Sequence, residues 1–176
     1  MNLDISTYMI TKEIESSYDF MINRKLYCTP LQELISDNYV DSRNSIKNTN
    51  LYQELHEDFG FVGVPGIVEI FIKDNLLEIT IEEVEVFWVD FSKFLVAALR
   101  SENNIFFYHD SLHLRISQNH IIDTKKIFLE VYIDDSLFNH LVLTDLEIQQ
   151  LLGQAKSLFT LLNEITTDFN YHLISF

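Results

Sequence analysis

Cysteine is almost absent from this chain, since Cys28 is the only one among 176 residues. One cysteine excludes an internal disulfide, and without a Cys pair or a Cys/His cluster we expect a cytoplasmic setting. Arg24 and Lys25 are the only sequence neighbours that would lower the pKa of this thiol. We therefore interpret Cys28 as a packing residue and not as a nucleophile.

Long hydrophobic runs are also missing. The longest uninterrupted apolar run, Phe94 to Leu99, is far shorter than the ~20 residues that a membrane-spanning helix needs. Residues 1–4 contain neither the basic nor the apolar region of a signal peptide. The composition is that of a globular protein, with 47% hydrophobic and 22% charged residues. We expect a soluble protein that does not contact membranes.

Glycine is scarce and forms no nucleotide-binding motif. Three of the four glycines lie within residues 60–66, where their spacing fits neither the dinucleotide nor the P-loop pattern. The sequence also lacks the G-x-S-x-G motif of serine hydrolases. We interpret residues 60–66 as a joint between an N-terminal region, 1–59, and a sheet-forming body, 60–176, within one compact domain.

The histidines show no metal-binding spacing. His109 and His113 bracket an expected two-residue turn, which would place His109 opposite Leu112 and His113 opposite Tyr108. The two imidazoles would then lie on opposite sides of a sheet. His56 lacks a second histidine at the spacing of zinc proteases. We expect no metal site and no cofactor.

Neighbouring carboxylates are the remaining option for an enzyme. Glu82, Glu83 and Glu85 lie close together in sequence. Acid–base catalysis by two carboxyl groups needs one that is desolvated beside one that stays ionised. A solvated strand face provides no such difference, so we predict that the protein is not an enzyme and has no catalytic residue.

Basic residues are few, at 12 Lys and Arg against 27 Asp and Glu, and the net charge is -15. Lys125-Lys126 is the only adjacent basic pair after residue 25, which excludes a nucleic-acid-binding surface. The stretch from Glu54 to Asp90 contains ten acidic residues and one basic residue, Lys73. A concentrated negative surface repels nucleic acid and anionic lipid and attracts basic proteins.

Alternating apolar residues predict a body made of β-hairpins. The expected hairpins join 68–72 to 77–81, 105–109 to 112–117, and 127–133 to 137–143. After the first hairpin the alternation slips by one residue, which predicts a bulge or a second turn at Glu82-Glu83 and a strand over 84–88.

Two amphipathic helices are expected in the body. Asp90 is in a position to cap a helix over 91–99. Thr144 and Glu147 form a capping box ahead of an apolar stripe over 148–165, which is the strongest helical pattern in the chain.

The predicted fold class is α+β: an antiparallel sheet of about six strands with both helices packed on one face, plus a mostly helical N-terminal region. Within that region we expect a strand over 3–9, a helix over 30–38 capped by Thr29, and a polar loop over 37–50. A short helix is expected over 50–58.

The acidic strand face is the predicted binding surface. Its carboxylates repel one another, and a cationic partner would relieve that repulsion. Trp88 shares the apolar parity of Val84 and Val86, so it either packs in the core or anchors a partner. The predicted partner-binding residues are Glu69, Glu78, Glu82, Glu83, Glu85 and Trp88.

The predicted function is an acidic protein-binding module with a basic protein partner, of which a toxin domain is one example. In size, charge and lack of catalytic motifs the chain resembles the immunity proteins of bacterial toxin systems, which bind and block a partner toxin. This resemblance rests on bulk properties and covers no defined span.

Three alternatives stay open. The first is a self-associating interaction domain, a homodimer for example, in which Phe71, Phe87 or Trp88 form the contact. In the second, the acidic surface serves only to keep the protein soluble. The third is an enzyme whose histidines and acidic residue come together only in space, in a buried pocket.

Overall fold

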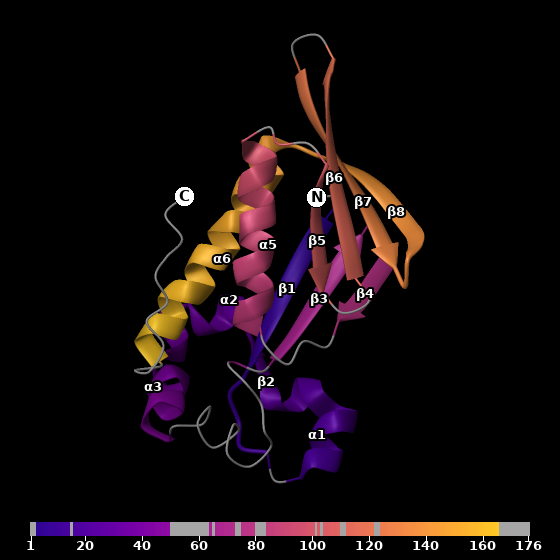
Figure 1. The fold of residues 1–176 in the computed structure, drawn as a ribbon. Helices are drawn as coiled ribbons and strands as arrows, with labels where there is room; N and C mark the ends of the chain where they lie inside the picture. The colour runs from indigo at the N-terminus through magenta and orange to yellow at the C-terminus, as the bar shows by residue number, and fades with distance from the viewer. Residues whose placement is uncertain are drawn as a thin grey trace.

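The computed structural model describes residues 3–14, 16–49, 64, 66–72, 75–79, 84–100, 102, 104–109, 112–121 and 124–165. Within these residues the chain forms two antiparallel sheets and two main helices, α5 (Val84–Leu99) and α6 (Asp145–Ile165) (Figure 1). The predicted α+β class with antiparallel strands and two main helices is confirmed. The strands belong to two sheets, however, and not to one.

Sheet A contains the start of the chain. Its strand order is β2 (Cys28–Pro30), β1 (Leu3–Ile10), β3 (Gly66–Ile72) and β4 (Asn75–Ile79). The hairpin formed by β3 and β4 confirms the first predicted hairpin. Pairing of β1 with β3 places residues from both sides of the predicted boundary in the same sheet. The boundary between residues 59 and 60 itself stays a prediction.

The prediction of a mostly helical N-terminal region is wrong at its start. Leu3, Ile5 and Met9 are buried at alternate positions, and this is the pattern of a strand with one face on the core. The expected strand over 3–9 is confirmed, and in sheet A it lies between β2 and β3. Because the pairing with β3 joins distant parts of the sequence, no local pattern indicated it.

Short helices follow β1. They are α1 (Ser17–Asn23), η1 (Arg24–Tyr27), α2 (Leu31–Leu34), η2 (Asp37–Tyr39) and α3 (Val40–Thr49). Thr29 is not a helix cap, because it belongs to β2 and its hydroxyl hydrogen-bonds that of Thr11 at 2.7 Å. The predicted loop over 37–50 is largely helical, and buried Ile46 anchors α3 to the core. The helix predicted over 50–58 lies outside the described residues.

Sheet B has the order β5 (Ile105–His109), β6 (Leu112–Ile121), β7 (Thr124–Ile133) and β8 (Ser136–Leu143). The hairpins predicted for these strands are confirmed. Asp134 and Asp135 connect β7 to β8 with φ of 48° and 62°. Two successive positive φ values are typical of the tight turn that matches the twist of a hairpin.

The strand predicted over 84–88 is wrong, because these residues form the first turns of α5. Val84, Phe87, Trp88 and Phe91 are all buried at helical spacing. Val84 and Trp88 are four residues apart, a spacing that fits both a strand and a helix, so the short window misled the prediction. Asp90 is therefore not an N-cap. The bulge predicted at residues 82–83 lies outside the described residues.

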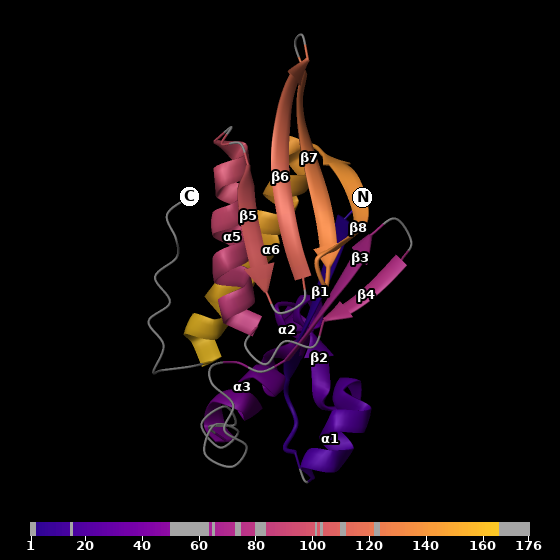
Figure 2. The same ribbon diagram turned by 45° about the vertical axis from the view of Figure 1, so that its right-hand side comes forward.

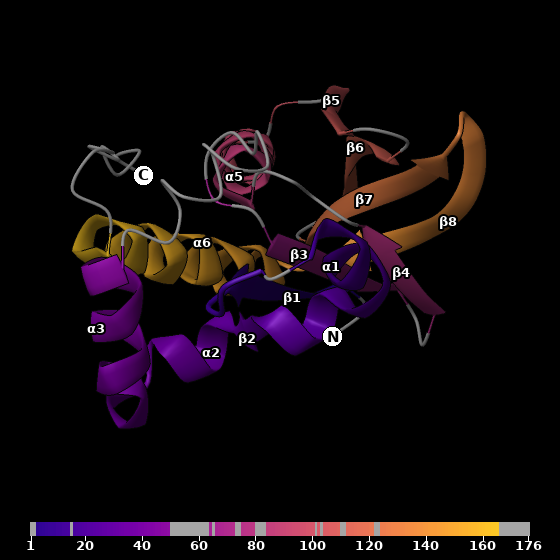
Figure 3. The same cartoon turned by 90° about the horizontal axis from the view of Figure 1, so that it is seen from below.

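α6 begins as predicted. The amide of Glu147 donates to Oγ1 of Thr144 at 3.2 Å, and the amide of Thr144 donates to Oε2 of Glu147 at 2.9 Å. This reciprocal pair is a capping box. α6 packs beside α5 and contacts α3 (Figures 1 and 3), and both sheets share one hydrophobic core with these helices. None of the helices in the described part of the chain is both long and apolar enough to span a membrane.

Candidate functional site

Glu69, the first glutamate of the predicted acidic face, is buried in sheet A. Only 2% of the residue is exposed, and its carboxylate forms an ion pair with Nζ of Lys25. The same ammonium lies 5.4 Å from the centre of the Tyr8 ring. Glu78 lies directly opposite Glu69 in the pairing of β3 with β4. The Lys25 ion pair compensates the charge of Glu69 from within the protein.

Glu85 is buried as well, in the first turn of α5. Its two carboxylate oxygens accept from the amide of Val64 at 2.9 and 2.8 Å, and the amide of Val84 donates to the Val64 carbonyl at 2.9 Å. A carboxylate near a helix N-terminus is also favoured by the helix dipole. Glu85 therefore fastens Val64 to the start of α5 and does not lie on an exposed strand.

Trp88 is fully buried, so the predicted role as an exposed anchor does not fit its position. Its indole Nε1 donates to Oγ1 of Thr7 at 2.9 Å, which joins α5 to β1. Phe87 and Phe91 pack against the indole ring at centroid distances of 5.7 and 5.9 Å. Of the two interpretations left open by the sequence, the structure places Trp88 in the core.

The acidic stretch is therefore only partly visible. Among its ten acidic residues, the structure describes the side chains of Glu69, Glu85 and Asp90, and Asp90 pairs with Lys93 at 2.9 Å. The side chain of Glu78 and residues Glu82 and Glu83 lie outside the described part. Each described carboxylate thus has a partner within the protein. The contact role predicted for the whole set stays a prediction.

Sheet B has one face on the core and one toward solvent (Figure 2). Its buried residues alternate along each strand, for example Leu112, Leu114 and Ile116 on β6. We call the other side the open face. Its residues are Phe106, Tyr108, His113, Arg115, Ser117, Phe128, Glu130, Tyr132, Leu137, His140 and Val142.

Several large aromatic and aliphatic side chains of the open face are exposed. Phe106 is 52% exposed, Tyr108 62% and Leu137 57%. The rings of Phe106 and Tyr108 stack at a centroid distance of 6.1 Å, and Tyr108 meets the ring of His113 edge-on at 4.7 Å. Large exposed side chains held in fixed positions by a sheet are typical of contact surfaces.

Three polar side chains of the open face, Arg115, Glu130 and Tyr132, contact one another. Nη1 of Arg115 lies 3.5 Å from Oε2 of Glu130, and the guanidinium lies 5.8 Å from the centre of the Phe106 ring. The hydroxyl of Tyr132 donates to Glu130 at 3.0 Å, and this hydrogen bond raises the pKa of Tyr132 above its ordinary value. These contacts fix the aromatic rings and leave the open face locally close to neutral.

The open face was not predicted from the sequence. β5 reads Ile-Phe-Phe-Tyr-His and has no polar alternate positions, so its solvent side could not be recognised by pattern. No local signal for an open side was available, because a run with so few polar residues is typical of a strand buried on both faces. The predicted register of His109 opposite Leu112 and Tyr108 opposite His113 is confirmed.

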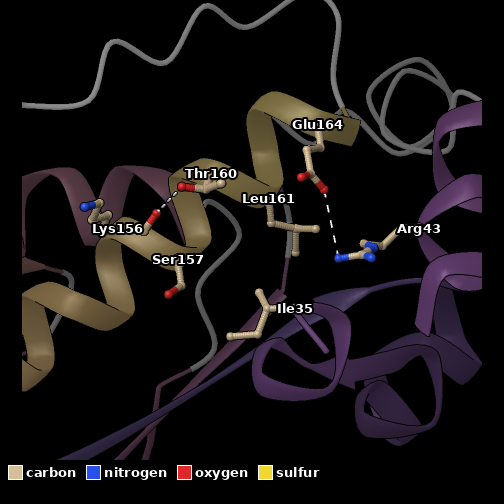
Figure 4. Close-up of a pocket in the computed structure, with 7 residues that line it drawn as sticks. All are labelled: Ile35, Arg43, Lys156, Ser157, Thr160, Leu161 and Glu164. Carbon is tan, nitrogen blue, oxygen red and sulfur yellow. Dashed lines mark hydrogen bonds and ion pairs between the residues drawn. The ribbon is translucent and has the colours of Figure 1, made fainter. Parts of the chain in front are cut away.

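A shallow pocket of about 240 Å³ lies between α6 and the α2–α3 segment (Figure 4). Arg43 and Glu164 face each other across it at 4.0 Å. The hydroxyl of Thr160 donates to the Lys156 carbonyl at 2.9 Å, and that of Ser157 donates to the Gly153 carbonyl at 3.1 Å. Because both hydroxyls bond their own helix, this pocket is a weaker candidate than the open face.

Cys28 is half-buried in β2, and burial raises the pKa of its thiol to about 12 from an ordinary 9.0. The residues in the described ranges contain no group of three or more His, Cys, Asp or Glu that could hold a metal ion.

We expect Cys28 to react slowly with thiol reagents in the native protein. The thiolate is the reactive form, and a rise in pKa from 9.0 to about 12 makes it roughly a thousandfold less populated at pH 8. The measurement compares the rate of disulfide exchange with an aromatic disulfide reagent in native and urea-unfolded protein at pH 8. Similar rates in the two states would contradict the packing role of Cys28.

Comparisons of this chain with protein-family models, with curated proteins and with solved structures found no match. Its function is therefore argued from the site alone.

Proposed function

We propose that this protein is a protein-binding module that contacts a basic partner through the open face of sheet B. The observation that carries the proposal is the exposure of Phe106 and Tyr108 on β5 and of Leu137 on β8, at the two edges of the open face. In typical interfaces a few residues, often aromatic ones, contribute most of the binding energy. Backbone pairing joins β5 to β8 into one continuous sheet, so the open face is already ordered before binding. Little conformational entropy is therefore lost when a partner binds.

Charge supports a basic partner. The net charge of -15 produces a negative potential around the whole molecule, which speeds encounter with basic proteins. On the open face, Arg115 pairs with Glu130, so these two charges offset each other. The exposed apolar side chains of this face are therefore available for contact with a partner that the negative potential attracts. Steering by the field and anchoring by the aromatic face are separate contributions, and only the first is sensitive to salt.

Inhibition of a basic toxin is the narrower form of the proposal. An inhibitor of this kind needs a rigid contact surface and a charge opposite to that of its target. The open face and the net charge of -15 support both requirements. A basic protein encoded beside this chain would be the first partner to test.

The triple variant Phe106→Ser, Tyr108→Ser, Leu137→Ser tests the proposal. The wild type and the variant are each immobilised and exposed to lysate of the source organism. We expect the amount of basic protein retained by the variant to be lower by a factor of about ten or more. Retention of basic proteins by the wild type should decrease as the salt concentration rises, because salt screens the steering field, but the contribution of the open face should persist.

The control variant is Tyr18→Ser, Ile22→Ser, Leu26→Ser, which removes three exposed apolar side chains from α1 and η1. It should bind as the wild type does, and unchanged melting temperatures would show that both variants fold. Equal retention by the wild type and the open-face variant would refute the proposal.

Two other sequence predictions can be separated in the same assay. If Glu78, Glu82 and Glu83 supply contact charge, replacing all three with Gln will weaken binding and reduce its dependence on salt. If the open face instead holds a second copy of the chain, sedimentation will show a salt-resistant dimer that the open-face variant does not form.

A further inference from the structure

β5 is an edge strand that lacks the residues that usually protect such an edge. In the strand order of sheet B it pairs with β6 on one side, and none of the described strands pairs with it on the other. Its five residues, Ile105–His109, include no acidic residue, lysine, arginine, proline or glycine. Natural proteins normally protect an exposed edge with such residues, because unpaired amides and carbonyls there attract another strand.

A groove of about 400 Å³ runs along this edge, between β5 and α5. Four consecutive residues of β5, from Ile105 to Tyr108, line one wall. The other wall consists of helix residues one turn apart, namely Asp90, Lys93, Phe94 and Ala97. α5 and β5 lie next to each other along this length (Figures 1 and 2).

The groove has the form that accepts an extended peptide. In an antiparallel pair, alternate residues of an edge strand direct their amides and carbonyls away from the partner strand. Two residues connect β5 to β6, so His109 and Leu112 form the hydrogen-bonded closing pair of this hairpin. Counting back by alternate residues, the amides and carbonyls of Phe106 and Tyr108 point away from β6. A strand added there would gain backbone hydrogen bonds and place alternate side chains over Phe94 and Ala97.

We infer that an extended segment of the basic partner adds to the free edge of β5 as a further strand of sheet B. This inference rests on the proposed function and specifies how the partner docks. The net charge of -15 favours a segment with lysine or arginine and opposes a second copy of this chain. Asp90 at the rim of the groove pairs with Lys93 at 2.9 Å, so the preference for a basic segment comes from the charge of the whole molecule and not from the groove itself.

The test uses short labelled peptides that alternate lysine with valine, leucine or phenylalanine, with binding measured by fluorescence anisotropy. Each peptide is made in three forms. One is unmodified, one carries a methyl group on the backbone amide nitrogen of every lysine, and one carries it on the backbone amide nitrogen of every apolar residue. Only one parity of amides faces β5 in an added strand. We expect one methylated form to bind at least about tenfold more weakly and the other to bind like the unmodified peptide.

A variant of the protein completes the test. Ala97→Trp fills the groove and should weaken binding by about tenfold or more. Val86→Trp is its control, because Val86 is exposed on α5 but does not line the groove. If both methylated forms bind like the unmodified peptide, if none of the peptides binds, or if Ala97→Trp has no effect, strand addition is wrong.

Failure of this inference differs from failure of the proposed function. A partner that the open-face variant releases, but that binds Ala97→Trp as tightly as the wild type, would leave the proposed function standing and remove strand addition. A dimer of the wild type that Ala97→Trp abolishes would make a second copy the occupant and would overturn the inference.

Discussion

Trp88→Ala is expected to lower the free energy of unfolding by about 3–5 kcal/mol. Trp88 is fully buried between Phe87 and Phe91, and it connects α5 to β1 through its hydrogen bond to Thr7. Truncation to alanine removes the apolar area of the indole and leaves a cavity among rigid neighbours. The loss would be a large part of the stability of a domain of this size.

Urea unfolding measures this loss of stability. The variant Trp88→Phe separates the contribution of the hydrogen bond to Thr7 from that of the buried apolar volume. Phenylalanine keeps most of the apolar volume but leaves the buried Thr7 hydroxyl without its indole donor, so we expect a loss of about 1–3 kcal/mol. If Trp88→Ala left stability unchanged but abolished partner binding, Trp88 would be the exposed anchor that the sequence allowed, and the core assignment would be wrong.

Gly66→Ala is expected to destabilise the protein by about 3 kcal/mol. A Cβ at Gly66 would overlap the carbonyl oxygen of Tyr8 on β1 and would lie 2.7 Å from Cγ2 of Val84 on α5. The carbonyl belongs to the backbone of a paired strand, so it cannot move aside without disturbing the β1–β3 ladder. Only glycine allows the two strands and the helix to approach so closely at this point.

Gly153→Ala is the matched control for this prediction. Gly153 is exposed in α6, and a Cβ there meets no atom within 4 Å. Because alanine is the better helix former, we expect Gly153→Ala to stabilise the protein by about 0.5–1 kcal/mol. Thermal and urea unfolding of the two variants measure both effects. Equal changes in the two variants would show that Gly66 is not at a close contact.

The parts of the fold that sequence predicted well are those determined by neighbours in the chain. The Thr144–Glu147 capping box begins α6, and the Asp134-Asp135 turn joins β7 to β8. Each of these signals lies within a few residues, so a single sequence is enough to identify it.

The rest depended on contacts between distant residues. The segment over 84–88 has an apolar alternation that fits a strand. Its structure is determined by the packing of α5 against α6, β5 and β3. Likewise, Glu69 and Glu85 looked like surface charges because their partners, Lys25 and the Val64 amide, are far away in sequence. Local pattern carries no information about such partners.

The candidate site was out of reach of the sequence for a related reason. β5 is apolar on both faces, and only the order of strands in sheet B shows that one of these faces and one edge are open. A run such as Ile-Phe-Phe-Tyr-His is equally typical of a fully buried strand. Composition therefore pointed to the acidic residues, while the exposed aromatic group lies on other strands.

The measurement that tests the role of the open face most directly is calorimetry with the purified partner that the wild-type protein retains. The dissociation constant should be about a hundredfold weaker for Phe106→Ser, Tyr108→Ser, Leu137→Ser than for the wild type. It should be unchanged for the Tyr18→Ser, Ile22→Ser, Leu26→Ser control. Equal constants for all three proteins, or a loss confined to the control, would contradict this account.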